Sequence, residues 1–339
     1  MNLKRLPDTI YGMWKEIVCC NAENSLLSRN ESNAIKGLLI MLVVLGHNKY
    51  VMQGGLSNMY LYSFHVYAFY YLPFLYDFKL MSWGNFFKKN LRRLYIPYTV
   101  FFILLLVLSF LQGHQLSINN IFITYICGSQ NLLVNNLGFG SFLWFIPTML
   151  SVLFFRQIYY RLGYIGRNIL LVISALCLVG FSYMIPIYVY TWWYSPFCLT
   201  VGLAMVFPAI CLRYIVSKVR SIAIVLSFFI LTVAILIFYP VRSEYFLTYL
   251  TINRIVCPVL IFSLLLTLMK YVSKSELIIE IGIQSFKIYL FHIFIYNAFY
   301  MLCDRYKPGI YEGLIIFVIS LTIAYAISKI GIVRYVFPK

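Results

Sequence analysis

Apolar stretches of about twenty residues recur along this chain of 339 residues. Each is long enough to cross roughly 30 Å of hydrocarbon as a helix that rises 1.5 Å per residue. Charged residues make up only 11% of the sequence and hydrophobic residues 62%, whereas a soluble domain is about a quarter charged. A water-soluble fold is excluded because it could not bury this much apolar surface. The sequence therefore predicts an all-α protein, a polytopic bundle of transmembrane helices.

About ten such stretches are present, near residues 33–53, 60–79, 94–113, 141–161, 168–186, 194–213, 221–240, 247–269, 284–303 and 311–331. The segment 119–134 is short and polar at both ends, which predicts a re-entrant or interfacial segment rather than an eleventh span. We expect residues 1–31 to be a cytoplasmic leader that could form an amphipathic helix. Residues 32–333 would be a single transmembrane domain and residues 334–339 a short cytoplasmic tail.

The basic residues predict the orientation of the bundle. A formal net charge of +17 would suggest nucleic-acid binding in a soluble protein, but Lys and Arg of polytopic proteins gather in cytoplasmic loops. With ten spans, 22 of the 27 basic residues fall on one side of the membrane. We therefore expect cytoplasmic termini, a multi-pass protein of the plasma (inner) membrane, and no nucleic-acid partner. The eight cysteines show neither metal-ligand nor disulfide spacing, so no metal is expected.

Few ionisable side chains lie inside the predicted spans. Such a group is costly in hydrocarbon, and it is a functional candidate when it faces the interior of a bundle. The sequence offers four of this kind, namely His47, His65, Arg254 and His292. The alternative for each is a structural group that is satisfied by a neighbouring backbone carbonyl.

Lys36 and His47 mark the two ends of the first predicted span. They are eleven residues apart, which corresponds to about three helical turns and roughly 16 Å along one helix face. This face therefore carries a cation near the cytoplasmic surface and an imidazole deep in the membrane, and it could line a path across the bilayer. Alternatively, Lys36 extends to lipid headgroups and His47 only bonds a carbonyl.

A basic loop follows the second predicted span. It contains Lys88, Lys89, Arg92 and Arg93 within six residues. Clustered cations suit an anion that carries several phosphates, and Arg adds bidentate geometry. The same four residues would also satisfy the positive-inside rule or bind anionic lipid.

Several short motifs occur in a characteristic order on these spans. They are Lys36 and His47 in KGLLIMLVVLGH, the FH at Phe64 and His65, the basic RRLYIPY, the LWFIP that begins at Leu143, and GIQSFKIYLFH from Gly282 to His292. In their order and placement the chain resembles the acyltransferase-3 family of membrane O-acyltransferases over about residues 32–331. Members of this family modify surface polysaccharides and related acceptors.

The resemblance implies that His47 is the essential histidine and that Lys36, Lys88, Lys89, Arg92 and Arg93 bind acyl-CoA. It implies acetyl-CoA or another acyl-CoA as donor substrate, no bound cofactor, and a hydroxyl of a carbohydrate or cell-surface glycan as acceptor. His47 would act as general base or through an acyl-histidine. The family's Arg-x-x-Arg is here Lys89-x-x-Arg92, which lacks one planar guanidinium fork.

Four further residues are candidates to position the acceptor or stabilise the oxyanion, namely His65, Arg254, Tyr289 and His292. The alternative function is a membrane transporter or polysaccharide export component without acyl transfer. A structural scaffold is disfavoured by the cost of buried cations. Membrane lipid is an expected partner, and the sequence leaves the oligomeric state open.

The charge pattern makes a testable prediction about topology. Residues 113–140 contain no Lys or Arg, whereas residues 80–93 contain four, so the first segment should lie outside and the second inside the cell. Cysteine accessibility mapping should label single cysteines in the two segments from opposite sides. Labelling of both from one side would contradict the ten-span topology.

Overall fold

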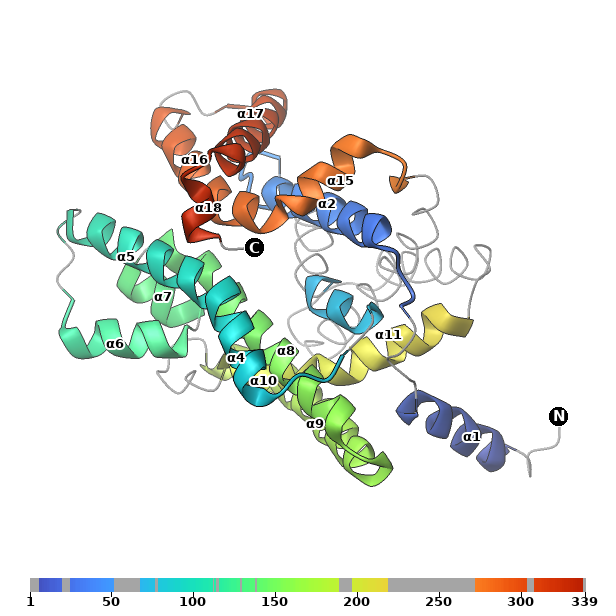
Figure 1. Cartoon of the computed structure of the whole chain (residues 1–339). Coiled ribbons are helices and arrows are strands. Elements are labelled where there is room, and N and C mark those ends of the chain that lie inside the picture. The colour runs from blue at the N-terminus through green and yellow to red at the C-terminus, as the bar shows by residue number, and fades with distance from the viewer. Residues whose placement is uncertain are drawn as a thin grey trace.

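Figure 1 shows a computed structural model of the chain, which describes residues 6–19, 25–51, 68–76, 79–111, 113, 116–128, 130–137, 139–188, 197–218, 272–303 and 308–337. Within these ranges every regular element is a helix, as predicted. The elements are α1 (Leu6–Val18), α2 (Arg29–Gly46), η2 (Leu72–Leu75), α4 (Trp83–Asn90), η3 (Leu91–Tyr95), α5 (Ile96–Leu111), α6 (Ile118–Cys127), α7 (Gln130–Leu137), η4 (Phe139–Trp144), α8 (Phe145–Arg161), α9 (Tyr164–Tyr188), α10 (Phe197–Ala204), α11 (Val206–Lys218), α15 (Glu276–Ile283), α16 (Ser285–Cys303), α17 (Ile310–Lys329) and α18 (Val333–Val336).

Local sequence signals explain where several helices begin. At α2, Ser28 and Glu31 form a capping box in which each side chain accepts a hydrogen bond from the other residue's backbone N–H. Pro97, Pro147 and Pro208 fall in the first turns of α5, α8 and α11. Each of these helices continues from a preceding helical segment, so each proline lies where the helical type changes and not at a free helix start. A proline inside a helix removes one backbone hydrogen bond, which such an irregular turn accommodates.

Five helices are long and apolar enough to cross a membrane: Trp83–Leu111, Phe142–Arg161, Cys198–Ser217, Ser285–Cys303 and Ile310–Lys329. They correspond to the predicted spans 94–113, 141–161, 194–213, 284–303 and 311–331, and α9 covers the predicted span 168–186. The predicted spans 221–240 and 247–269, and most of 60–79, lie outside the described residues. The number of ten spans and the cytoplasmic termini therefore stay predictions.

The first predicted span, 33–53, was placed too far along the chain. α2 begins at Arg29 and ends at Gly46, a length of 18 residues or about 27 Å. The helix ends because the Asn48 side chain turns the backbone. Its Oδ1 accepts hydrogen bonds from the N–H groups of Tyr50 at 3.0 Å and Val51 at 2.9 Å, and such local bonds compete with helix continuation.

The predicted re-entrant segment 119–134 forms two short helices, α6 and α7. Gly128 separates them in a left-handed conformation with φ of +53°, which glycine adopts without a Cβ penalty. A Cβ at this position would lie 2.5 Å from Cγ of Pro147. Each helix is too short to cross the membrane alone, in agreement with the expectation from the sequence.

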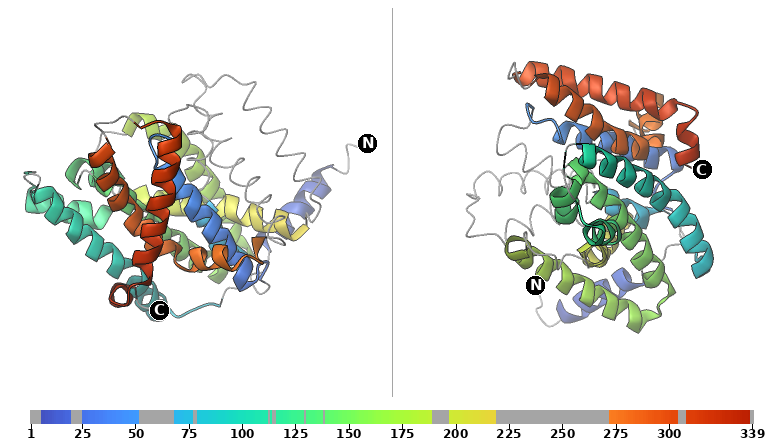
Figure 2. Two further views of the ribbon diagram at one scale, coloured as in Figure 1. Left: turned by 90° about the horizontal axis from the view of Figure 1, so that it is seen from above. Right: turned by 90° about the vertical axis from the view of Figure 1, so that its left-hand side faces the viewer.

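The helices gather into groups that meet around the centre of the molecule. α2, α16 and α17 contact one another, and α15 lies across α2 (Figures 1 and 2). α8, α9, α10 and α11 form a second group, and α5, α6 and α7 lie at one side of it. The leader helix α1 contacts α9 and α11, where Nε1 of Trp14 donates a hydrogen bond to Oδ1 of Asn168 at 2.6 Å.

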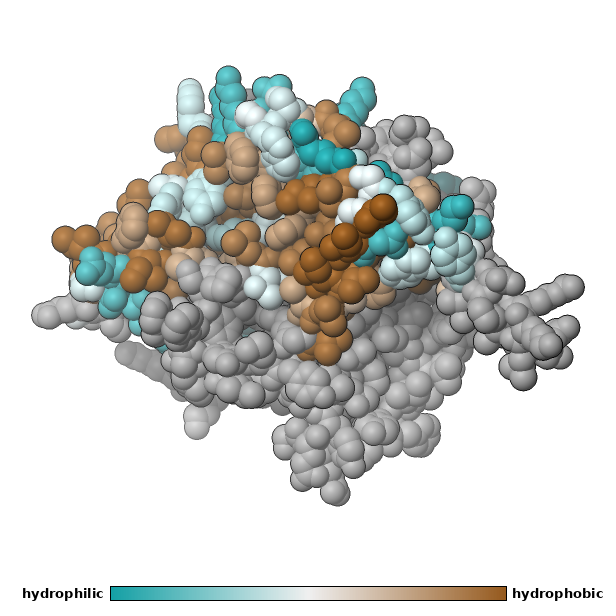
Figure 3. Space-filling view, turned by 90° about the horizontal axis from the view of Figure 1, so that it is seen from below, coloured by the Kyte–Doolittle hydropathy of each residue, from teal (hydrophilic) through white to brown (hydrophobic). Residues whose placement is uncertain are grey.

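Large apolar side chains remain exposed on the outer faces of α5, α9 and α17. Figure 3 shows a broad apolar zone on one face of the molecule with hydrophilic residues along its rim. Exposed apolar surface of this extent is typical of helices that face lipid. Together with the five long apolar helices, it identifies a membrane protein.

Glycines allow α2 and α15 to touch backbone to backbone. A Cβ on Gly282 would overlap the carbonyl oxygen of Asn33, and one on Gly37 would overlap the carbonyl oxygen of Ile278. Small residues are enriched at helix contacts in membranes because they permit this close approach. At the end of α15, Glu280 pairs with Lys329 of α17, and the hydrogen bond from Lys329 lowers the pKa of the Glu280 carboxyl.

The contact between α2 and α15 predicts a strong effect of one methyl group. Gly282→Ala should lower the thermal unfolding temperature of the purified protein, because overpacking of this kind costs about 1–3 kcal/mol. Differential scanning fluorimetry in detergent would measure the change. Gly12→Ala in α1 is the matched control, because a Cβ there meets nothing within 4 Å. Equal unfolding temperatures for both variants would show that the two helices do not touch.

Candidate active site

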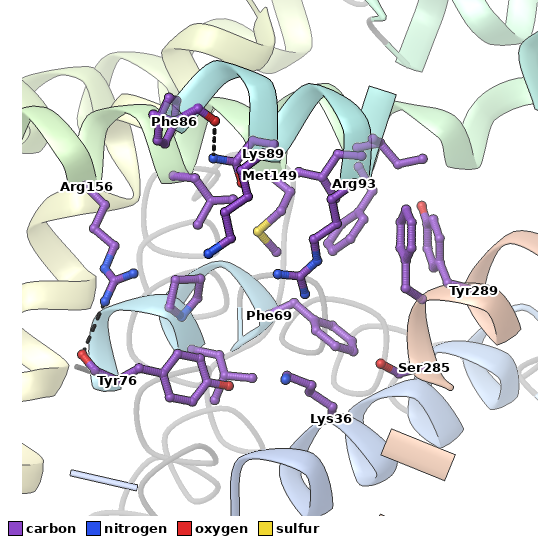
Figure 4. Close-up of a pocket in the computed structure, with 18 of the residues that line it drawn as sticks. Lys36, Phe69, Tyr76, Phe86, Lys89, Arg93, Met149, Arg156, Ser285 and Tyr289 are labelled. Carbon is purple, nitrogen blue, oxygen red and sulfur yellow. Dashed lines mark hydrogen bonds between the residues drawn. The ribbon is translucent and has the colours of Figure 1, made fainter. Parts of the chain in front are cut away.

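A cavity of about 300 Å³ opens between α2, η2, α4, η3, α8 and α16 (Figure 4). Most of its wall is apolar and comes from Val43, Phe69, Leu72, Pro73, Met81, Phe86, Leu94, Phe145, Ile146, Met149, Leu153 and Phe286. The remaining residues of the wall are polar, aromatic or basic. The cavity can therefore hold a long ligand that is apolar along part of its length and charged at one end.

Four basic residues line this cavity, namely Lys36, Lys89, Arg93 and Arg156. Lys36 rises from α2 on one side, and Lys89 and Arg93 reach toward it from α4 and η3 on the other (Figure 4). No Asp or Glu is among the described residues of the wall. Like charges held together without an acid repel one another, so the cavity favours an anionic ligand.

A second, more open cavity of about 670 Å³ adjoins the first. The two share Lys36, Tyr76, Arg93, Ser285 and Phe286, so these five residues lie at the boundary between the cavities. The outer cavity also contains Arg29 and the polar first turns of α2, and again none of its described wall residues is acidic. Lys36 and Arg93 therefore stand where the inner cavity meets the outer one, whereas Lys89 and Arg156 line only the inner cavity.

The basic loop divides between two helix faces. Lys89 and Arg93 are four residues apart, which places them on one face, and both line the inner cavity. Lys88 and Arg92 are also four residues apart on a different face, and they line neither cavity. The predicted donor pair Lys89 and Arg92 is thus split, and the geometry brings Arg93 beside Lys89 instead.

Two buried arginines hold η2 at the side of the cavity. Nη2 of Arg156 donates to the carbonyl of Tyr76 at 3.2 Å, and Nη1 of Arg213 donates to the carbonyl of Phe74 at 2.7 Å. The last carbonyls of a helix lack partners within it, so cations are stabilised there. On α2, Nζ of Lys36 donates to Oδ1 of Asn33 at 3.4 Å and lies 5.6 Å from the centre of the Tyr76 ring.

His47 is the C-cap residue of α2. Its carbonyl accepts a hydrogen bond of 2.6 Å from the hydroxyl of Tyr300 on α16. The next residue, Asn48, is buried and donates from Nδ2 to the carbonyl of Gly313 on α17 at 2.6 Å. α16 and α17 therefore fix the backbone on both sides of the His47 side chain, which is itself half-buried.

His292 of α16 lies next to His47, with their ring centres 5.1 Å apart and the planes tilted by 49°. The His292 side chain is buried, and its Nδ1 lies 3.2 Å from the carbonyl oxygen of Ile288. Since a carbonyl only accepts, this contact places a hydrogen on Nδ1 and makes Nε2 the acceptor of the neutral ring. The ring centres of Tyr289 and Tyr296 lie 5.8 and 6.3 Å from the ring centre of His292.

The histidine pair lies just beyond the inner end of the cavity. Val43 and Tyr289 line the cavity, and His47 and His292 follow them by about one turn on the same two helices. Neither histidine is part of the cavity wall. The Tyr289 hydroxyl donates to the carbonyl of Phe142 and does not point at either imidazole as a donor.

Two of the candidate residues, the expected absence of a metal and one overlooked arginine remain to be placed. His65 and Arg254 lie outside the described residues. Among the residues that the structure describes, no group of three His, Cys, Asp or Glu side chains could hold a metal ion. In the charge pattern of the sequence, Arg156 is only one of the 22 basic residues on one side of the membrane. A cation several residues inside the predicted span 141–161 was the signal that could have identified it.

Asn48 and Tyr300 were also missed as residues that position His47. Asn48 directly follows the histidine, and a buried amide at the end of a predicted helix could have been suspected from sequence. Tyr300 is one of 30 tyrosines, and nothing in its neighbourhood distinguished it.

One comparison with known proteins agrees with this geometry. A family model described as an acyltransferase domain, Acyl_transf_3, matches residues 29–329. No curated protein and no solved structure is significantly similar to the chain. The matched region begins at the first residue of α2 and ends at the last residue of α17, and it contains the inner cavity and the histidine pair. The chain therefore belongs to the acyltransferase-3 family and is a membrane acyltransferase.

Proposed function

We propose that this protein transfers an acyl group, acetyl by default, from acyl-CoA to a hydroxyl of a carbohydrate or cell-surface glycan. The observation that carries the proposal is the cavity with four basic residues, no acid among its described wall residues, and an apolar inner end near two histidines. Coenzyme A has the matching polarity, with phosphates at one end and the thioester at the other. The family match does not favour the transporter alternative.

The donor would lie with its phosphates among Lys36, Lys89, Arg93 and Arg156. Arginine suits this task because its planar fork can bind two phosphate oxygens at once. The pantetheine arm would then follow the apolar wall toward Val43 and Tyr289. Lys36 and His47 are separated by roughly 16 Å along α2, so an extended arm can bring the thioester toward His47.

His47 would act as the general base. In the neutral form its imidazole takes the proton of the acceptor hydroxyl, and the hydroxyl oxygen attacks the thioester carbonyl carbon. The carbon–sulfur bond then breaks, and the coenzyme A thiolate takes up the proton from the imidazolium. Transfer through an acyl-histidine uses the same residue, with the imidazole nitrogen as nucleophile in the first step.

His292 is placed to orient His47. Its Nδ1–H is held by the carbonyl of Ile288, which fixes the tautomer and leaves an acceptor nitrogen on the ring beside His47. The ring contact would limit rotation of the His47 imidazole. Tyr289, His65 and Arg254 remain candidates to position the acceptor or to stabilise the oxyanion.

The acceptor side and the location of the protein are also proposals. Lys49, two residues after the histidine, is exposed, so an acceptor could approach His47 from this end of α2. We place the protein in the plasma (inner) membrane as a multi-pass enzyme. Glycan composition in cells with and without the gene would identify the acceptor.

The role of His47 can be tested by replacement. His47→Ala should lower the turnover of acyl-CoA with an acceptor extract by at least about a hundredfold, which is the low end of the contribution of a general base. Release of free CoA thiol measures the turnover. Coenzyme A affinity and unfolding temperature should stay close to wild type, because the Tyr300 bond uses the His47 carbonyl and not the ring. Substantial remaining turnover would show that His47 is structural.

The donor site can be tested with two matched double variants. Lys89→Gln with Arg93→Gln should raise the KM for acyl-CoA by at least about tenfold, because each charge-assisted contact contributes on the order of 1.5–3 kcal/mol and the loss of ground-state binding appears in KM. Lys88→Gln with Arg92→Gln removes the same two charges from the same loop and should leave KM unchanged. Isothermal titration with a non-hydrolysable acyl-CoA would check the affinities. Equal effects of the two variants would mean that the loop acts only through its overall charge.

A further inference from the structure

Lys88 and Arg92 belong to a helix face that the donor cavity does not use. Both side chains are exposed, and neither lines a described cavity. Phe87 and Leu91, each 41% exposed, precede Lys88 and Arg92 by one residue and form the neighbouring exposed row of α4 and η3. Two cations thus alternate with two exposed apolar side chains on one outward surface.

This surface continues into the lipid-facing side of α5. Ile96 is 43% exposed at the start of α5, and Ile103, Leu104, Val107 and Leu108 are exposed further along it. The continuity depends on the π-turn η3, in which the N–H of Ile96 bonds the carbonyl of Leu91 five residues earlier. The extra residue stacks Ile96 above Leu91, so exposed apolar side chains follow one another from Phe87 through Leu91 to Ile96 and resume at Ile103.

The basic end of this stripe has the features of a membrane interface. Trp83 begins α4, and the guanidinium of Arg161 lies 4.6 Å from the centre of its ring. Tryptophan is enriched at the headgroup level, where an amphipathic ring has one apolar and one wet side. Lys88 and Arg92 follow Trp83 on the same helix, between this interfacial ring and the exposed apolar side of α5, which is the zone where phospholipid phosphates lie.

We propose that Lys88 and Arg92 bind the phosphate headgroup of an anionic phospholipid whose acyl chains lie along Phe87, Leu91 and Ile96. The Arg92 guanidinium can bind two phosphate oxygens, and Lys88 adds a second cation one turn away. The apolar stripe supplies contact for the chains that a soluble phosphate would lack. This site shares the loop with the proposed donor site but is separate from it, and it does not depend on acyl transfer.

The proposal can be tested by native mass spectrometry of the full chain in detergent, titrated with phosphatidylglycerol. Lys88→Gln with Arg92→Gln should weaken phosphatidylglycerol binding at least tenfold. Lys89→Gln with Arg93→Gln removes the same charge from the cavity face, so it is the matched control and should leave the affinity within about twofold of wild type. Phosphatidylcholine, which is zwitterionic, should bind all three proteins equally weakly. Glycerol phosphate, the headgroup without its chains, should not compete at the concentrations at which the lipid binds.

Each other outcome would overturn the proposal. Equal weakening by both double variants would show non-specific attraction to a positive loop. Weakening only by the Lys89 and Arg93 change would place the lipid in the cavity and would also count against the donor site. Full competition by glycerol phosphate would indicate a soluble anion site instead of a lipid site. If the Lys88 and Arg92 double variant does not insert into the membrane, two further variants test the site. The charge-preserving exchange Lys88→Arg with Arg92→Lys should bind the lipid as wild type does, and Leu91→Ser should weaken the binding. A different result for either variant would overturn the proposal.

Discussion

The contact between α2 and α15 at Gly37 and Gly282 governs the geometry of the site. It brings the backbone of α15 against α2 one residue after Lys36, and α16 begins directly after α15. At the other end of α2, Asn48 is bonded to α17 and the His47 carbonyl to α16. The helix that carries both the cation and the histidine is thus held at two points, and the distance between them is set by a rigid helix.

The basic side chains around the cavity are stabilised in two different ways, either by carbonyl groups of the fold or by the surrounding solvent. Arg213 and Arg156 are buried and bond the carbonyls of η2, whereas Lys89 and Arg93 remain exposed at a cavity without acids among its described wall residues. The first two are stabilised by the fold itself. The second two are exposed, so an anion that enters the cavity can pair with them directly, whereas Arg156 lines the same cavity while it keeps its bond to the Tyr76 carbonyl.

The sequence predicted the helical class and the six helices that coincide with expected spans, because these depend on local apolar runs, whereas the roles of Lys36 and His47 stay predictions. It could not predict that His292 would meet His47, since the two are far apart in the chain and only the bundle brings them together. The end of α2 was misplaced because the apolar residues Tyr50, Val51 and Met52 follow the polar stretch His47–Lys49. The Asn48 side chain stops the helix through hydrogen bonds that hydropathy does not report. Arg156 was missed because counting basic residues by side assigns each cation to a loop.

The π-turn at Leu91–Tyr95 sets the rotational phase between α4 and α5. Each residue of an α-helix turns the chain by about 100°, so the single extra residue decides which sides of the two segments align. A deletion of one residue here would leave both helices intact and keep all four cations. It would nevertheless rotate α4 against α5, so that Lys89 and Arg93 could not face the cavity while α5 kept its apolar side toward lipid. Shortening or lengthening this turn by one position is therefore a change that the enzyme should tolerate far less than most substitutions in the same loop.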